Sequence, residues 1–248
     1  MRPDDGIAAS SSSGQDRVYD RYISRPTGIS LLHQPEAAEA GSLSERAYYR
    51  IRELIVTLEL PPGSVVDERA LMQRLELGRT PVREALRALA RERLVVVYPR
   101  RGMVVAGVDA GALSALAEVR AVLEPMAARL AAVRATAADR TVVGELLGEL
   151  ARVAGGHDER ALIELDQRIH RHVYRCAHNP YLEATLNEHY VLTLRIWFLA
   201  LDRVARLDAA VGEHGALLEA IRDRDPAVAE AMMRYHIEAF ESAIRSVL

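Results

Sequence analysis

The stretch from Asp67 to Gly102 reads DERALMQRLELGRTPVREALRALARERLVVVYPRRG. A short segment with helical spacing of its apolar residues is followed by a turn at Gly78 and by a second helical segment with an arginine at every fourth position. A β-branched run and a Pro-Arg-Arg-Gly tip come next. Helix, turn, basic helix and hairpin, in this order, are typical of a winged helix-turn-helix, whose second helix enters the major groove of DNA. The stretch therefore predicts a DNA-binding module.

The arginines of the second helical segment share one face, because residues four apart stack along a helix. Arg79 and Arg83 lie nearest the N-terminus, where a recognition helix meets base edges, and arginine donates bidentately to guanine. Thr80 is expected to contact a phosphate or a base edge, and Arg100 and Arg101 are expected to reach the DNA from the hairpin tip. An ordinary solvated basic face is the alternative interpretation, but the adjoining turn and hairpin favour DNA binding.

Charge divides the 248 residues into a basic and an acidic part. Residues 43–108 hold 12 arginines and 8 acidic residues, whereas residues 109–248 hold 16 and 21. A basic module joined to an acidic one is typical of a nucleic-acid binder with a second function. Residues 1–42 contain a serine run and little apolar periodicity, so a disordered tail is expected there.

The low aromatic content favours helices, and the single cysteine fits a reducing compartment. Hydrophobic residues make up 50% of the chain and aromatic residues only 5%, so the core must be built mainly from leucine, valine and alanine. The single cysteine, Cys176, excludes an intrachain disulfide and is expected to be a small buried residue. Trp197 and Phe198 are expected in a core or cavity wall. No segment resembles a signal peptide or a membrane span, so a cytoplasmic protein without membrane contact is expected.

Capping and breaking residues place the expected elements. An S-x-x-E capping box at residues 42–45 opens the first helix, and Gly78 is expected to permit the sharp turn of the module. Strands are expected at 94–98 and 103–106. From residue 109 on, the apolar periodicity predicts about six helices. Their expected ranges are 109–134, 139–154, 158–177, 180–205, 208–223 and 226–247.

The expected fold class is therefore mainly α, with an N-terminal winged helix-turn-helix and a C-terminal all-helical bundle. The tail is assigned to residues 1–42, the DNA-binding domain to 43–108, and an effector-binding and dimerisation domain to 109–248.

A second constellation lies in the helical part. Asp166 and His170 are four residues apart and project from one face of a predicted helix, and His214 and His236 lie in later helices. One carboxylate and three imidazoles suit a divalent transition metal, with positions left for water or a ligand. The alternative is that each histidine is a separate surface or hydrogen-bonded residue.

Residues 42–108 resemble the N-terminal domain of the GntR family of bacterial transcription regulators. The matching motifs are RTPVREAL at Arg79–Leu86, LPPG at Leu60–Gly63, DERAL at Asp67–Leu71 and PRRG at Pro99–Gly102. The resemblance implies that Arg69, Arg79 and Arg83 contact operator DNA and that Gly102 lies at the wing. The chain departs from the family at Gly78, where serine or threonine is usual, and at Arg93, where glycine is usual.

Residues 109–248 resemble the FCD effector domain of the FadR branch of this family, and the helix count resembles its shorter, VanR-like form. The resemblance implies that Asp166, His170, His214 and His236 bind a divalent metal such as zinc, nickel or manganese. It also implies a small carboxylate effector near the metal, with Arg120 as the matching arginine and Arg195 as a weaker candidate for the cavity. The alternative for Arg120 is a surface arginine paired with Glu124 one turn later.

These observations favour a ligand-responsive transcription regulator, not an enzyme, that binds double-stranded DNA as a homodimer on a pseudo-palindromic operator. Two alternatives stay open at the level of sequence. One is a metal-dependent hydrolase with a DNA-binding appendage, although no H-E-x-x-H pattern supplies a general base. The other is an architectural DNA binder whose helical domain only dimerises.

Overall fold

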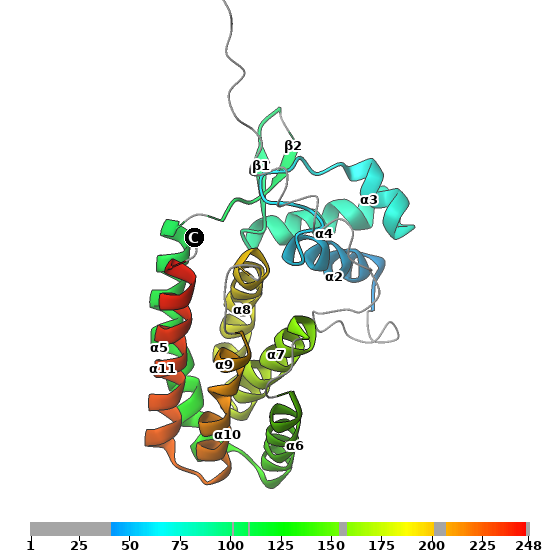
Figure 1. Ribbon diagram of the computed structural model, residues 1–248. Coiled ribbons are helices and arrows are strands. Elements are labelled where there is room, and N and C mark those ends of the chain that lie inside the picture. The colour runs from blue at the N-terminus through cyan, green and yellow to red at the C-terminus, as the bar shows by residue number, and fades with distance from the viewer. Residues whose placement is uncertain (1–40, 101, 109, 154–157, 201–206, 247–248) are drawn as a thin grey trace, which may run out of the picture.

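The computed structural model describes residues 41–100, 102–108, 110–153, 158–200 and 207–246. The expected tail up to residue 40, and Arg101, lie outside these residues. The described chain forms a small winged unit and a larger helical bundle, so the predicted mainly α class is confirmed (Figure 1). None of the described helices is both long and apolar enough to cross a bilayer.

The winged unit follows the predicted order of helices and strands. Its elements are α2 (Leu43–Val56), α3 (Glu68–Leu75), α4 (Arg79–Arg91), β1 (Val95–Tyr98) and β2 (Gly102–Val105). The capping box at the start of α2 is confirmed, since the Ser42 side chain accepts from the Glu45 N–H at 3.1 Å and the Glu45 carboxylate accepts from the Ser42 N–H at 3.0 Å. The apolar face of α2, including Ile51 and Ile55, is fully buried and packs on α4.

The turn between α3 and α4 is made differently from the sequence-based expectation. Asp67 caps α3 by accepting from the backbone N–H groups of Arg69 at 2.8 Å and Ala70 at 3.1 Å. The role expected of Gly78 is wrong, because its φ of −71° and ψ of 172° are open to any residue. Glu76 makes the reversal instead, at the end of α3, in the left-handed conformation with φ 55°.

β1 and β2 pair in antiparallel register and form the wing. Val95 lies opposite Val105 and Tyr98 opposite Gly102, which joins the strands through a three-residue tip. Gly102 has φ 84°, a conformation that favours glycine and explains why this residue follows the Arg-Arg tip.

The end of α4 shows the physical consequence of Arg93. The N–H of Leu94 donates to the carbonyl of Leu89 at 3.0 Å and the N–H of Arg93 donates to that of Ala90 at 3.3 Å, the hydrogen bonds of a Schellman cap. This cap needs a left-handed residue after the helix, and Arg93 supplies it with φ 61°. Arginine therefore adopts a conformation that glycine would adopt without steric cost.

The bundle contains one helix break that the sequence did not predict. Its helices are α5 (Ala110–Arg134), α6 (Ala137–Val153), α7 (Glu159–Cys176), α8 (Pro180–Ala200), α9 (Leu207–Gly212), α10 (His214–Arg222) and α11 (Pro226–Arg245). The single helix expected over 208–223 is wrong, because the chain breaks at Glu213. The His214 side chain contacts the Val211 carbonyl with Nδ1 at 3.0 Å, which competes with the helical hydrogen bonds at this point.

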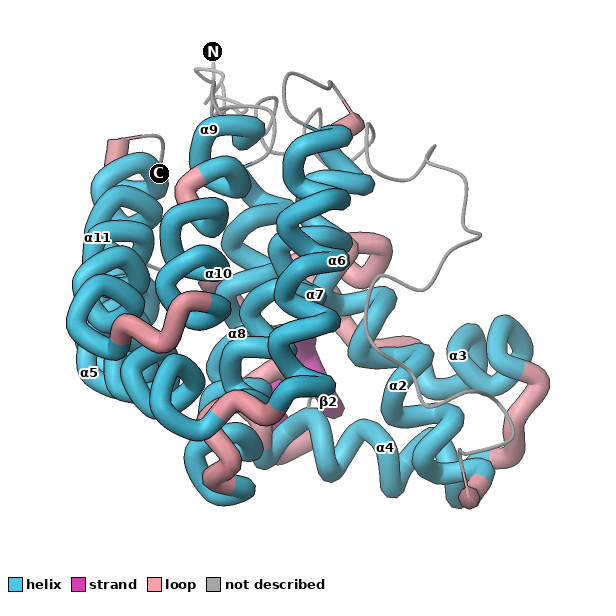
Figure 2. Tube along the Cα trace, turned by 90° about the horizontal axis from the view of Figure 1, so that it is seen from below, coloured by secondary structure: helices cyan, strands magenta, loops and turns pink. Residues whose placement is uncertain are grey.

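α5 and α11 pack side by side along the face of the bundle away from α2 and α3 (Figures 1 and 2). Pro125 lies inside α5 and has no N–H, so the carbonyl of Ala121 one turn earlier loses its helical partner. Arg234 of α11 donates to this carbonyl at 3.4 Å. The proline is therefore tolerated because a neighbouring helix replaces part of the missing hydrogen bond.

Arg93→Gly is expected to raise the free energy of unfolding by about 1 kcal/mol, because it relieves the left-handed strain of an L residue. Arg87→Gly is the matched control, and it should lower the free energy of unfolding by about 1 kcal/mol because Arg87 lies within right-handed α4. Urea denaturation followed by circular dichroism measures both. A destabilised Arg93→Gly protein would contradict this account of the cap.

Candidate metal centre and DNA-binding surface

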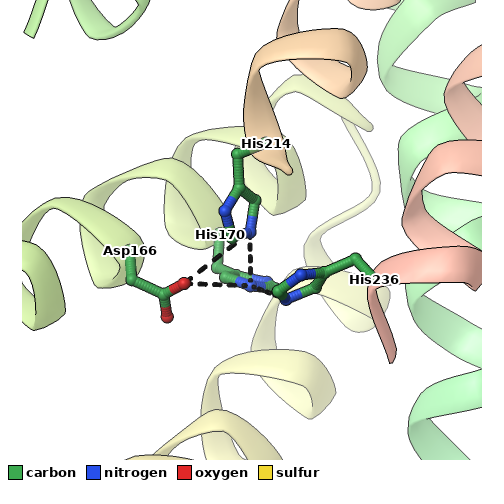
Figure 3. Close-up of side chains that lie close together, drawn as sticks. All are labelled: Asp166, His170, His214 and His236. Atoms are coloured by element: carbon green, nitrogen blue, oxygen red, sulfur yellow. Dashed lines mark hydrogen bonds and ion pairs between the residues drawn. The ribbon is translucent and has the colours of Figure 1, made fainter. Parts of the chain in front are cut away.

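The four predicted metal ligands converge in the core of the bundle (Figure 3). Asp166 and His170 lie on consecutive turns of α7, His214 begins α10, and His236 lies within α11. One ligand atom from each residue lies within 4.8 Å of the other three, and all four residues are buried. The fold thus brings together side chains that the sequence places on three separate helices.

The spacing of the imidazole nitrogens fits a shared metal ion. Nε2 of His170 lies 3.1 Å from Nε2 of His214 and 3.3 Å from Nε2 of His236. Two nitrogens that are each about 2.1 Å from one ion lie roughly 3.0 Å apart at a right angle and roughly 3.4 Å apart at the tetrahedral angle. The observed separations fall in this range, so the three histidines are placed to ligate one ion at adjacent positions.

The other nitrogen of each ring faces a hydrogen-bond acceptor. Nδ1 of His214 lies 3.0 Å from the Val211 carbonyl, and Nδ1 of His236 lies 3.2 Å from a carboxylate oxygen of Glu213. Nδ1 of His170 lies 3.1 Å from the Tyr174 hydroxyl oxygen and 3.0 Å from a carboxylate oxygen of Glu124. An acceptor at Nδ1 favours the tautomer with its proton there, which leaves the lone pair on Nε2. Three such lone pairs then face one another, an arrangement that a cation between them would stabilise.

Asp166 supplies the carboxylate of the cluster. Its Oδ2 accepts a hydrogen bond from Tyr190 of α8, and burial raises the pKa of Tyr190 well above its usual value, so the hydroxyl keeps its proton. Its Oδ1 is buried without a hydrogen-bond partner among the described residues. This oxygen lies 3.7 Å from Nε2 of His214. Leaving a buried carboxylate oxygen unpaired is costly, and a metal ion would satisfy it.

Arg120 is paired with Glu124, as the alternative interpretation expected, but the pair is buried rather than on the surface. The two side chains are 3% and 1% exposed, and Nε of Arg120 donates to Glu124. Burial alone would raise the pKa of Glu124, but Arg120 and then His170 outweigh it and hold this pKa at about 2. Burial would likewise lower the pKa of Arg120, and Glu124 reverses the sign. Both groups are therefore charged at neutral pH.

His214 and His236 are held in the neutral form that a metal requires. Burial is the largest cause of the lowered pKa of His214, which is about 4. The pKa of His236 is lowered well below its usual value by burial, by His214 and His170, and by the Arg120 charge. Neutral imidazoles at neutral pH are ready to ligate without first losing a proton.

Arg195 is buried on α8 and contacts the chain at the base of the wing. Its side chain is 2% exposed and donates to the carbonyl of Ala106, the residue that follows the wing. Ala106 is also bonded to the start of the wing, because its N–H donates to the Leu94 carbonyl at 3.0 Å. Arg195 therefore joins α8 of the bundle to the base of the wing.

The predicted DNA-contacting residues of α3 and α4 share an exposed surface. Arg69, Arg79, Thr80 and Arg83 are all exposed. Gly78 has no side chain to cap α4, so the first N–H groups of this helix remain available to a phosphate oxygen. At the wing, Arg100 and Gly102 are exposed at the tip, and Arg101 lies outside the described residues.

Glu68 is a residue of this surface that the sequence did not single out. Its carboxylate accepts from Nε of Arg83 at 2.8 Å, and the Arg83 side chain remains 45% exposed. The contact orients the guanidinium and leaves its two terminal nitrogens for DNA. Tyr190 and Glu213 were also missed, because nothing in the local sequence relates them to Asp166 and His236.

A winged helix-turn-helix joined to a helical bundle defines a two-domain DNA-binding protein. Residues 43–105 match the family described as bacterial regulatory proteins, gntR family, and residues 115–239 match the FCD domain. The chain therefore belongs to the GntR family of transcription regulators, in the group that carries an FCD domain. FCD domains bind small-molecule effectors.

Two relatives and one solved structure illustrate the similarity. The galactonate operon transcriptional repressor of Escherichia coli is 30% identical over 211 residues, which cover 75% of this chain and 90% of the relative. The probable D-xylose utilization operon transcriptional repressor of Paenarthrobacter nicotinovorans is 30% identical over 181 residues, with 73% and 79% covered. The structure of E. coli McbR/YncC superposes with a TM-score of 0.74 at 22% identity, covers 83% of this chain and 98% of its own, and supports the fold.

Acidification is expected to destabilise the metal-free protein through His214. The pKa of this group is about 4 in the folded chain against 6.5 for an ordinary histidine, so the unfolded chain binds the proton first and stability falls between pH 6.5 and 4. The loss from this one group is about 2–3 kcal/mol. Urea denaturation of chelator-treated protein across this range measures it. His214→Gln cannot titrate and should lose less stability over the same interval, and equal losses in the two proteins would contradict the assignment.

Proposed function

We propose that this regulator binds one divalent transition metal through Asp166, His170, His214 and His236, and that the loaded bundle binds a small organic acid that changes its affinity for DNA. The observation that carries the proposal is the convergence of three Nε2 lone pairs beside the unpaired Oδ1 of Asp166. Three nitrogens and one carboxylate oxygen suit zinc, nickel or manganese, and four protein ligands leave further positions for ions that accept five or six.

A divalent ion would change the sign of the charge in the bundle core. With neutral histidines, the buried charges at the site are those of Arg120, Glu124 and Asp166, and they leave an excess of negative charge. A divalent ion makes the sum positive, which favours a carboxylate ligand in this low-dielectric surrounding. The E. coli relative is named for an operon of galactonate, itself a carboxylate.

Binding to DNA as a homodimer has support from an apolar stripe on α5. Val119, Val122, Met126 and Val133 are exposed on one face of this helix, which lies on the outer side of the bundle (Figure 1). A second copy of the chain would cover the stripe. Two recognition helices would then enter two major-groove half-sites of a pseudo-palindromic operator. The names of the two relatives favour repression.

α8 would couple the two sites. Tyr190 of this helix holds the Asp166 carboxylate, and Arg195, little more than one turn later, holds the base of the wing at Ala106. A ligand that favours one position of α8 would shift the wing and, by linkage, the affinity for DNA.

Arg83→Ala is expected to cost about 1–3 kcal/mol of operator affinity and to reduce discrimination between bases, because the terminal nitrogens of this arginine would face the groove in the proposed docking. The operator would be found by selection of bound genomic fragments, and affinities measured by fluorescence anisotropy at fixed salt. Arg222→Ala is the control, since Arg222 pairs with Asp223 on the bundle surface. An Arg83→Ala protein that binds as tightly and as selectively as the parent would refute the docking of α4.

His214→Ala is expected to weaken metal affinity by about tenfold or more while the helical content is kept, because one of three imidazole ligands is lost. Metal content after gel filtration, measured by inductively coupled plasma mass spectrometry, tests this. His178→Ala is the control, because His178 is exposed and pairs with Asp139 outside the cluster. Full occupancy in the His214→Ala protein would remove this residue from the site.

A further inference from the structure

A cavity of about 220 Å³ lies between α5, α8 and α11, beside the metal cluster but without any of its four ligands in its lining. The lining is mostly aliphatic and aromatic, with Leu116 on α5, Ile196 on α8 and Ile237, Phe240 and Ile244 on α11. An apolar cavity of about 150 Å³ is enough to hold a benzene molecule. The space therefore suits a ring with a short chain, or a short hydrocarbon chain.

The two ends of the cavity differ in exposure and in charge. Arg120 lines the cavity and is only 3% exposed, so it marks the inner end. Arg245 also lines it, is 61% exposed, and marks the mouth, where it donates to Ser114 at 2.9 Å and pairs with Glu241. The polar side chains of the mouth are thus bonded to one another.

Arg120 has donors left for a ligand. Its Nε is occupied by Glu124, and among the described residues its two terminal nitrogens make no hydrogen bond. The guanidinium lies over the Phe240 ring at 5.2 Å, which holds it against the cavity wall. A guanidinium with an unoccupied terminal pair of nitrogens is suited to bind a carboxylate in a bidentate manner.

We infer that the effector is a monocarboxylic acid with an apolar body, such as a medium-chain aliphatic or an arylalkanoic acid, with its carboxylate on Arg120 and its hydrocarbon along Leu116, Phe240 and Ile244. This inference rests on the proposed carboxylate effector and names its chemical class. A sugar acid fits less well, because its hydroxyl groups would be buried against an aliphatic wall without partners. The relatives' names, galactonate and D-xylose, therefore do not predict the ligand of this chain.

The chain carries its own reporter of the cavity. Trp197 is the single tryptophan, and its ring lies 4.8 Å from that of Phe240, a lining residue. A bromine atom quenches indole fluorescence at short range, so ω-bromo-octanoate bound in the cavity is expected to quench Trp197, and unbrominated octanoate is expected to reverse the quenching by competition.

The decisive experiment is a chain-length series on the metal-loaded protein, from butanoate to octanoate, with gluconate as the polyhydroxylated comparison. Competition against ω-bromo-octanoate gives each dissociation constant. Affinity is expected to rise about fourfold for each added methylene until the cavity is filled, because each is removed from water. Gluconate is expected to compete no better than butanoate. A flat series, or gluconate that binds as well as octanoate, would overturn the apolar class while leaving a metal-dependent carboxylate effector possible.

Two alanines on α5 provide matched variants. Ala117 lines the cavity, whereas Ala115 is exposed on the same helix and does not line it. Ala117→Phe should fill the space and weaken ω-bromo-octanoate binding by about tenfold or more, with metal content unchanged, and Ala115→Phe should leave binding unchanged. Equal quenching in both variants would overturn the assignment of the cavity. If Ala117→Phe does not fold, the chain-length series on the parent protein decides alone.

The proposed regulatory function is tested separately, by the effect of the acid and of the metal on operator affinity. If octanoate binds with the expected dependence on chain length but neither it nor the metal changes operator affinity, the ligand site is supported and the regulatory proposal is refuted. If no acid binds with or without metal, both are refuted.

Discussion

Three imidazole nitrogens with their lone pairs turned to one point repel one another unless positive charge lies between them. In this bundle the Nε2 atoms of His214 and His236 lie 3.1 and 3.3 Å from Nε2 of His170, and a carboxylate oxygen of Asp166 without a hydrogen-bond partner among the described residues lies beside them. The acceptors behind the rings of His214 and His236 favour the tautomer with the proton on the far nitrogen. A cation here would link α7, α10 and α11, so that metal binding and bundle packing stabilise each other.

The same core connects to the DNA-binding surface through α8. Tyr190 and Arg195 on this helix are both almost fully buried, one against Asp166 and the other against the chain that leaves the wing. Groups that are buried and hydrogen-bonded at both ends transmit small displacements, because a close-packed interior does not deform freely. The position of α8 is therefore the structural variable that an effector in the adjoining cavity would control.

The sequence predicted those local features of the fold in which the contacting residues are close together in the chain. The capping box at residues 42–45 and the two strands of the wing depend on residues a few positions apart, and they appear as expected, with the strand ends within one residue of the predicted ones. The break at Glu213 was not readable, because it follows from the side chain of His214 turning to the Val211 carbonyl. Gly78 was misread, since a glycine at a turn need not use its conformational freedom.

The sequence by itself indicated the two-part organisation, the shared face of the α4 arginines and the shared face of Asp166 and His170, because the spacing of the arginines and of the Asp-x3-His pair fixes faces of single helices. Only the tertiary structure decided that the Arg120–Glu124 pair is buried, that Glu124 and Glu213 stand behind His170 and His236, and that Arg195 holds the wing. These contacts join helices distant in the chain, and helix periodicity says which face is buried but not which side chains it meets there.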